Sequence, residues 1–127
     1  GVEVEGNISF QNLTVQANYT FTEKVKQEPL RLPKHAANLG ITYTTSKLQW
    51  GTHFRYVGTR KDQNFATNTI DKLAAFSLVD ARVSFPNFIG NATATLALTN
   101  VFDTPYTEFV GYSTLGRNLN IGLQYMF

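Results

Sequence analysis

The chain has 127 residues, of which 16% are charged and 13% aromatic, and its formal net charge is +2. This length fits one domain, and the aromatic content argues against a disordered chain or a coiled coil. The 11 Lys and Arg residues form no run, so nucleic-acid binding is not supported, and the lack of cysteine excludes disulfides and thiolate metal sites. No stretch approaches the roughly 18 apolar residues of a transmembrane helix.

Apolar and polar side chains alternate along the first half of the chain, which is typical of β-strands with two different faces. In the first segment, Glu3 and Glu5 lie on the polar face, and in the fourth segment His53 and Arg55 do so. Four strands are predicted here, at residues 1–10, 13–21, 37–44 and 48–56.

The second half of the chain continues the same pattern. Asp80 and Arg82 lie two residues apart on the polar face of the first of these segments. Three more strands are predicted, at residues 77–85, 91–100 and 117–127. The fold class expected from all seven is an all-β, antiparallel, up-and-down sheet.

The connections between these strands alternate in length. Three are short, at 11–12, 45–47 and 86–90, and three are long, at 23–35, 61–75 and 103–116. Short turns at one rim and long loops at the other are typical of outer-membrane barrels. The sequence therefore predicts a transmembrane β-barrel segment.

The alternation alone does not say which face points outward. Ionised side chains suit a water-filled lumen, and aromatic residues near the strand ends suit the two lipid interfaces. We therefore expect the apolar face to contact lipid and the polar face to line a lumen, through Glu3, Glu5, His53, Arg55, Asp80 and Arg82. A soluble lipocalin-like barrel, with the faces reversed, is the alternative.

The last strand carries a row of apolar side chains that ends on an aromatic residue. The row consists of Leu119, Ile121, Leu123, Tyr125 and Phe127. It resembles the C-terminal signal by which the barrel assembly machinery recognises bacterial outer-membrane barrels. A strand that still lacks a partner can be recognised through its open edge.

Five motifs extend the resemblance over the whole chain. They are "PLRLPKHAANLGITY" (29–43), "RYVGTR" (55–60), "LVDARVSF" (78–85), "LTNVFDTPY" (98–106) and "GYSTLGRNLNIGLQYMF" (111–127). Together they resemble the last part of a TonB-dependent outer-membrane receptor, and most closely the vitamin-B12 (cobalamin) branch.

The resemblance implies a 22-stranded barrel in a Gram-negative outer membrane, of which residues 1–127 are the last seven strands. The plug domain, the earlier strands and the segment that contacts TonB would then lie outside this chain. The three long loops would be extracellular and would help to bind a large nutrient such as cobalamin or a siderophore. A small autonomous outer-membrane barrel is the alternative, and open sheet edges would let an isolated segment self-associate.

No constellation of residues supports catalysis, and no cofactor is expected. Asn100 and Asp103 are interpreted as turn residues, and His35 and His53 lack the converging ligands of a metal site. Basic loop residues could attract phosphates or an anionic ligand, or could simply be solvated charges. They are Lys24, Lys26, Arg31, Lys34, Lys61 and Lys72.

Overall fold

The computed structural model describes residues 1–23 and 29–127, so the part of the predicted 23–35 loop at 24–28 lies outside the described residues. The described residues form nine β-strands. These are β1 (Val2–Phe10), β2 (Leu13–Phe21), β3 (His35–Thr44), β4 (Gln49–Val57), β5 (Arg60–Asn64), β6 (Thr69–Leu73), β7 (Phe76–Ile89), β8 (Ala92–Thr99) and β9 (Asn118–Tyr125). The described residues include no helix that could span a membrane.

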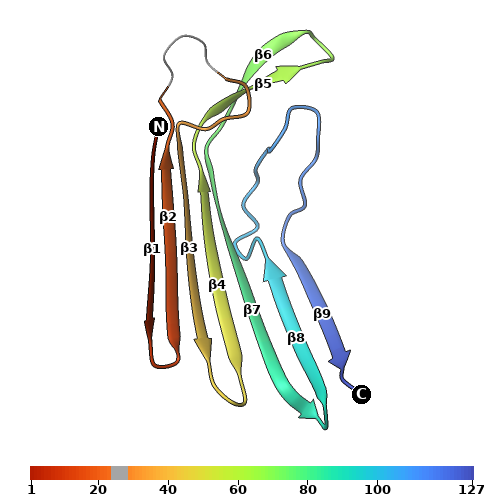
Figure 1. The fold of residues 1–127 in the computed structure, drawn as a ribbon. Helices are drawn as coiled ribbons and strands as arrows, with labels where there is room; N and C mark the ends of the chain where they lie inside the picture. Colours follow the sequence, from red (N-terminus) through yellow and green to blue (C-terminus); the bar gives the residue numbers. More distant parts are fainter. Residues whose placement is uncertain (24–28) are drawn as a thin grey trace.

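Seven of these strands form one antiparallel sheet in the order β1-β2-β3-β4-β7-β8-β9 (Figure 1). Each strand pairs with its neighbour along the chain, apart from the β5–β6 hairpin that is inserted between β4 and β7. The short turns lie at one end of the sheet and the long connections at the other. The predicted all-β meander of seven strands is therefore confirmed.

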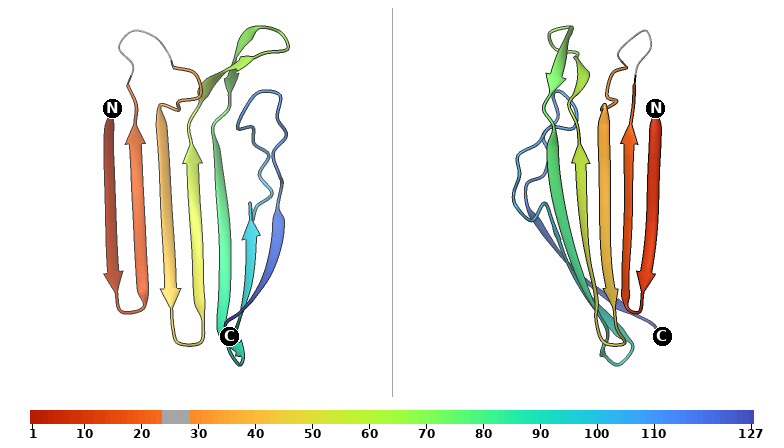
Figure 2. Two further views of the ribbon diagram at one scale, coloured as in Figure 1. Left: turned by 45° about the vertical axis from the view of Figure 1, so that its right-hand side comes forward. Right: turned by 90° about the vertical axis from the view of Figure 1, so that its left-hand side faces the viewer.

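The 61–75 segment, predicted as a loop, instead contains the β5–β6 hairpin, which rises beyond the long-loop end of the sheet (Figure 2). Arg60 pairs with Leu73 and Asn64 with Thr69. The turn between them contains Asn68 with a positive φ of 55°, a conformation that Asn tolerates well. The polar composition of this segment concealed its strand pairing.

Three strand ends also differ from the prediction by two residues or more. β3 begins at His35, inside the predicted 23–35 loop, instead of at Ala37. β7 continues through Pro86 to Ile89, because the register with β8 is irregular between Phe85 and Ile89 and a bulge tolerates proline. β9 ends at Tyr125 instead of at the last residue. Phe127 therefore stands beyond the last paired residue with its side chain fully exposed.

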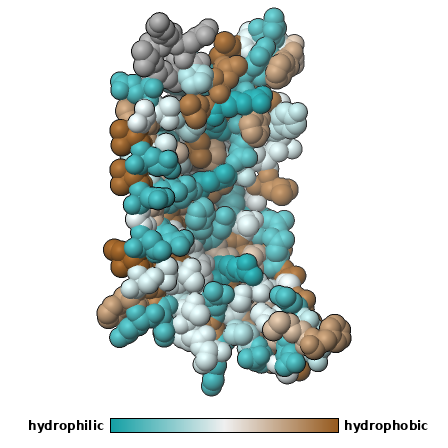
Figure 3. All heavy atoms as spheres, in the orientation of Figure 1, coloured by the Kyte–Doolittle hydropathy of each residue, from teal (hydrophilic) through white to brown (hydrophobic). Residues whose placement is uncertain are grey.

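The described sheet buries few large side chains. The buried apolar residues are Leu73, Phe76, Leu78 and Ala92. On the apolar face of the sheet, by contrast, Ile8 is 73% exposed and Ile121 76% exposed. Seen from the side drawn in Figure 3, hydrophilic side chains cover the middle of the sheet and hydrophobic ones project at its margin. The exposed apolar side chains of the opposite face call for an apolar partner, either lipid or another protein surface.

Ile121→Arg tests this requirement, because Ile121 pairs with Leu96 near the middle of β8 and points to the apolar face. If the apolar face contacts lipid, the substitution should lower the free energy of unfolding in bilayers by about 2–4 kcal/mol. Urea titration of the receptor in lipid vesicles measures this change.

The matched control is Asn120→Arg, which places the same charge on the opposite face of the same strand. It should change the folding free energy much less. Equal effects of the two substitutions would contradict a lipid-facing apolar surface.

Candidate functional site

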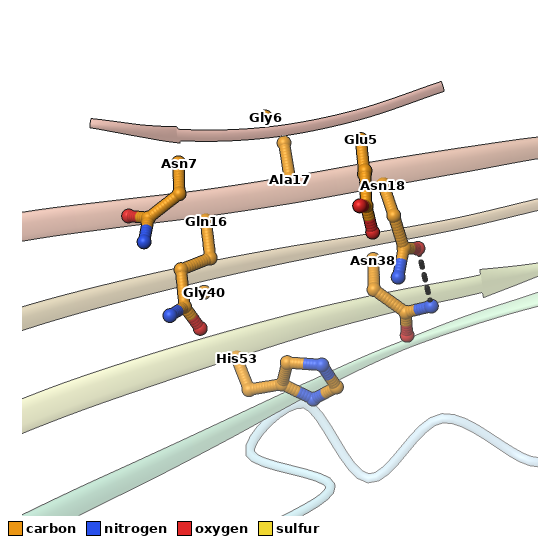
Figure 4. Close-up of a pocket in the computed structure, with 9 residues that line it drawn as sticks. All are labelled: Glu5, Gly6, Asn7, Gln16, Ala17, Asn18, Asn38, Gly40 and His53. Atoms are coloured by element: carbon orange, nitrogen blue, oxygen red, sulfur yellow. Dashed lines mark hydrogen bonds between the residues drawn. The ribbon is translucent and has the colours of Figure 1, made fainter. Parts of the chain in front are cut away.

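Polar side chains of neighbouring strands form rows across one face of the sheet. Glu5 lies opposite Asn18, Asn18 opposite Asn38, and Asn38 opposite Arg55. The Asn38 amide donates a hydrogen bond to Asn18 Oδ1 at 2.9 Å (Figure 4). The register places all the residues predicted to line a lumen on this one face: Glu3, Glu5, His53, Arg55, Asp80 and Arg82.

A hollow of about 520 Å³ lies over this polar face between β1 and β4. Its lining includes the side chains of Glu5, Gln16, Asn38 and His53 (Figure 4). Gly40 lies opposite both Gln16 and His53 and has no side chain to fill the space. The hollow is thus an open polar surface that can offer hydrogen bonds to a neighbouring group.

Asp80 anchors the start of the long segment that follows β8. Its Oδ1 accepts a hydrogen bond from the Asn100 backbone N–H at 2.8 Å. The buried Asn100 side chain then donates to Thr104 O at 3.0 Å and accepts from Thr104 N at 2.9 Å. Asn100 and Asp103 both have positive φ, of 50° and 53°. These residues therefore shape a turn, as the sequence predicts.

Asp103 joins the two ends of that segment. Its Oδ1 accepts a hydrogen bond from the Arg117 backbone N–H at 2.7 Å. Gly116 lies so close that a Cβ atom there would be 2.7 Å from the same oxygen. A side chain at this position would have to displace the Asp103 carboxylate, whose hydrogen bond to Arg117 N closes the 103–116 segment into a loop with a fixed base.

The 103–116 loop folds back against the polar face at the long-loop end. The ring of Tyr106 packs against that of Phe76, with the centroids 4.9 Å apart. Arg55 Nη2 lies 2.9 Å from Glu108 Oε1, and the Arg55 guanidinium lies 5.5 Å from the centre of the Phe76 ring. Phe76 therefore forms an aromatic base on which the loop and Arg55 meet.

Asp62 ties this loop to the other two. Its side chain is fully buried, and Oδ1 accepts hydrogen bonds from Arg31 Nε at 2.6 Å and from Gln63 N at 2.9 Å. Oδ2 accepts a hydrogen bond from the Val110 N–H at 2.8 Å. Arg31 also stacks on Phe109, with the guanidinium carbon 5.1 Å from the ring centre. One carboxylate on the hairpin thus holds residues from two other long loops.

The hydrogen bond from Arg31 is the main reason that the pKa of Asp62 lies below its ordinary value of 3.8. The hydrogen bond from Val110 acts in the same direction and burial opposes both. Because these donors favour the charged form, Asp62 is ionised at neutral pH. A buried carboxylate is then compensated by a cation and two backbone donors.

Arg60 precedes Asp62 by two residues on β5 and supports the same cluster. Its Nη2 donates to Thr107 O at 2.7 Å and to Glu108 O at 2.9 Å, and its guanidinium lies 5.3 Å from the centre of the Phe76 ring. Burial lowers the pKa of Arg60 below its ordinary value, while the negative charges of Glu108 and Asp62 oppose this shift. Its Nη1 is buried and finds no hydrogen-bond partner among residues 1–23 and 29–127.

The structure brings together the described parts of all three predicted long loops. Sequence reasoning considered Arg31 and Arg55 but did not single out Arg60, Asp62 or Phe76. The one available signal was the period of two in "RKD", which places Arg60 and Asp62 on the same side of a strand. The hydrogen bonds to Thr107 and Val110 depend on the path of a distant loop, so the sequence did not reveal them.

Comparison with known families identifies the fold. The family model described as "TonB dependent receptor-like, beta-barrel" matches residues 1–101. The chain belongs to the TonB-dependent receptor family. Proteins of this family are Gram-negative outer-membrane receptors that bind large ligands and TonB, and are not enzymes. The predicted outer-membrane location is therefore confirmed.

Solved structures with the same strand architecture are similar to this chain in fold. The pyoverdine outer membrane receptor FpvA from Pseudomonas aeruginosa PAO1, bound to pyoverdine, superposes with a TM-score of 0.75 at 22% identity, over 98% of this chain and 21% of that chain. The FpvAI–pyocin S2 complex gives a TM-score of 0.71 at 22% identity, over 97% and 19%. The chain thus spans about a fifth of the length of these structures. A match at this identity establishes the barrel fold.

Replacing Asp62 with Asn tests whether this carboxylate holds the loops together. The neutral side chain loses the charge that pairs with Arg31, so residues 103–116 should become more open at neutral pH. Limited proteolysis of the receptor in detergent should then cleave this loop several-fold faster. Asp71→Asn is the matched control, because Asp71 lies opposite Asp62 but bonds only to residues of its own hairpin among those described.

The lowered pKa of Asp62 also predicts a pH dependence. The folded-state pKa lies below the unfolded value, so this residue's contribution to loop stability is complete above about pH 4 and is lost as pH falls through the folded value. The NMR shift of the Val110 amide should titrate with a midpoint below 3.8. A midpoint at or above that value, or the same titration in Asp62→Asn, would contradict the assignment.

Proposed function

We propose that this chain is the C-terminal part of the barrel of a TonB-dependent receptor that takes up a large metal chelate. Residues 1–127 would supply the last seven strands of a 22-stranded barrel and three extracellular loops. The observation that carries the proposal is the polar face, which ends at a cluster of three interlocked loops. The plug domain and the TonB contact would lie in parts of the receptor outside this chain.

The polar face would line the lumen of the barrel. Support comes from the register, which gathers Glu3, Glu5, His53, Arg55, Asp80 and Arg82 on one side of the sheet. Further support comes from the opposite face, where large apolar side chains are exposed. Transmembrane barrels place polar residues inside and apolar residues toward lipid.

The open edges fit a segment of a larger barrel. Among the described residues, β1 pairs only with β2, and β9 pairs only with β8. In the full receptor the free edge of β9 would close on the first strand. The exposed row of Leu119, Ile121, Leu123, Tyr125 and Phe127 would serve as the signal that the barrel assembly machinery recognises.

The ligand that we favour is a ferric siderophore, with cobalamin as the alternative. The solved structures that superpose on this chain include a receptor described as bound to pyoverdine. The five sequence motifs resemble the cobalamin branch. Both ligands are large chelates, and either would enter past the Arg55–Glu108 and Arg31–Asp62 contacts of the extracellular loops.

Uptake measurements test this function. The receptor should be expressed in a Gram-negative strain that lacks its own pyoverdine and cobalamin receptors. Radiolabelled ferric pyoverdine and radiolabelled cyanocobalamin are then supplied in separate assays. We expect accumulation of ferric pyoverdine that requires both the receptor and TonB, and little accumulation of cyanocobalamin.

Receptor-dependent uptake of cyanocobalamin alone would assign the alternative ligand. Entry of small sugars that does not require TonB would contradict the proposal and favour an autonomous pore. A sheet-face variant such as Asn120→Arg serves as a control for expression, which outer-membrane fractionation measures.

A further inference from the structure

A second recess lies at the long-loop end, separate from the hollow over β1–β4. It has a volume of about 420 Å³ and lies between the β5–β6 hairpin and the ends of β2 and β3. Four cationic residues line it, namely Lys34, Arg60, Lys61 and Lys72, together with one carboxylate, Glu23. We call these residues, with the hydroxyls of Thr22 and Thr59, the basic cleft.

The hairpin register concentrates positive charge in the basic cleft. Lys61 and Lys72 are direct cross-strand partners, so their side chains leave the hairpin on the same side. Like charges placed directly opposite each other destabilise a strand pair. Asp62 and Asp71, the next pair along, point to the other side of the hairpin. The arrangement separates Lys61 and Lys72 from the two carboxylates of the hairpin, whereas Arg60 lies on the carboxylate side.

Apart from Glu23, which lines the cleft itself, the neighbouring carboxylates of the described residues are engaged in other contacts. Asp62 bonds to Arg31, Asp71 accepts hydrogen bonds from Asn64 and Thr69, and Glu108 pairs with Arg55. Lys61 already takes part in a contact within the protein. Lys34, whose ammonium lies 5.5 Å from the centre of the Phe21 ring, and Lys72 form no ion pair within the described parts of the chain.

Arg60 borders the cleft, but its charged group is engaged elsewhere. Its side chain leaves the hairpin on the side of Asp62, where Nη2 donates to Thr107 O and Glu108 O and the guanidinium lies over the Phe76 ring. The buried Nη1 atom therefore belongs to that cluster, and the positive charge of the cleft comes from its lysines.

We propose that the basic cleft binds an oxyanion, a phosphate or carboxylate group, at the mouth of the receptor. Lys34 and Lys72 would supply the charge, and Thr22 and Thr59 hydroxyl donors. The inference rests on the proposed function only in placing the cleft at the extracellular mouth. The oxyanion could belong to a soluble chelate or to the headgroup of an outer-leaflet lipid, since both present the same chemistry.

The test uses the receptor purified from outer membranes in a neutral detergent, with inorganic pyrophosphate as the soluble probe. Binding is measured by isothermal titration calorimetry at low and high salt. In the double variant Lys34→Gln/Lys72→Gln, affinity should fall about tenfold, and added salt should weaken the wild type more than the variant. Lys47→Gln, in the turn at the opposite rim, is the control for loss of a surface lysine.

A second arm identifies the source of the oxyanion. The receptor is mixed with vesicles of phosphatidylcholine alone or of phosphatidylcholine with lipid A, which carries phosphate groups. Retention on lipid A vesicles that is lost in Lys34→Gln/Lys72→Gln, without pyrophosphate binding, assigns the cleft to a lipid headgroup. Pyrophosphate binding that is lost in the same variant assigns it to a soluble ligand.

Unchanged binding of both probes in the double variant, or binding to neither probe by the wild type, would overturn the proposal. The TonB-dependent uptake assay separates this failure from a failure of the proposed function. Uptake that persists while the cleft binds neither probe rejects the oxyanion site alone. Cleft binding without any TonB-dependent uptake supports the oxyanion site and rejects the transport function.

Discussion

A strand that crosses a bilayer has to satisfy its backbone by pairing with neighbouring strands, and it has to present apolar side chains to lipid. The register, the two contrasting faces and the exposed apolar residues of this chain depend on these two conditions. Antiparallel pairing fixes the register, and the period of two places most polar side chains of the strands on one face and most large apolar side chains on the other. The apolar residues that a soluble protein would bury are therefore exposed here, and the few buried ones lie mainly near the long loops.

The sheet also decides where the loops meet. Arg55 and Phe76 end neighbouring paired strands on the polar face, so they form a platform at one rim. The 103–116 loop returns onto this platform because Asn100 and Asp103 close its base. Asp62 then completes the cluster by bonding to Arg31 and Val110. The loop cluster is thus built from segments that rigid strands bring together.

Alternation was enough to predict the seven strands, their antiparallel order and the shared polar face, because it follows directly from backbone geometry. It missed the β5–β6 hairpin, because β5 is polar on both sides and the two apolar residues of β6, Ile70 and Leu73, lie on opposite sides and give no contrast. It also missed the burial of Asp62. A carboxylate in a polar stretch looks solvated unless the path of the loop that covers it is known, and Val110 lies 48 positions away in the sequence.

The single carboxylate that joins three loops has a consequence for how such receptors diversify. Asp62 requires a cation from the first loop and a backbone donor from the third. If one loop were exchanged for that of a relative, the other two would keep a buried charge without its full set of partners. New specificity at this rim should therefore be acquired, or engineered, by exchanging the three loops as a set.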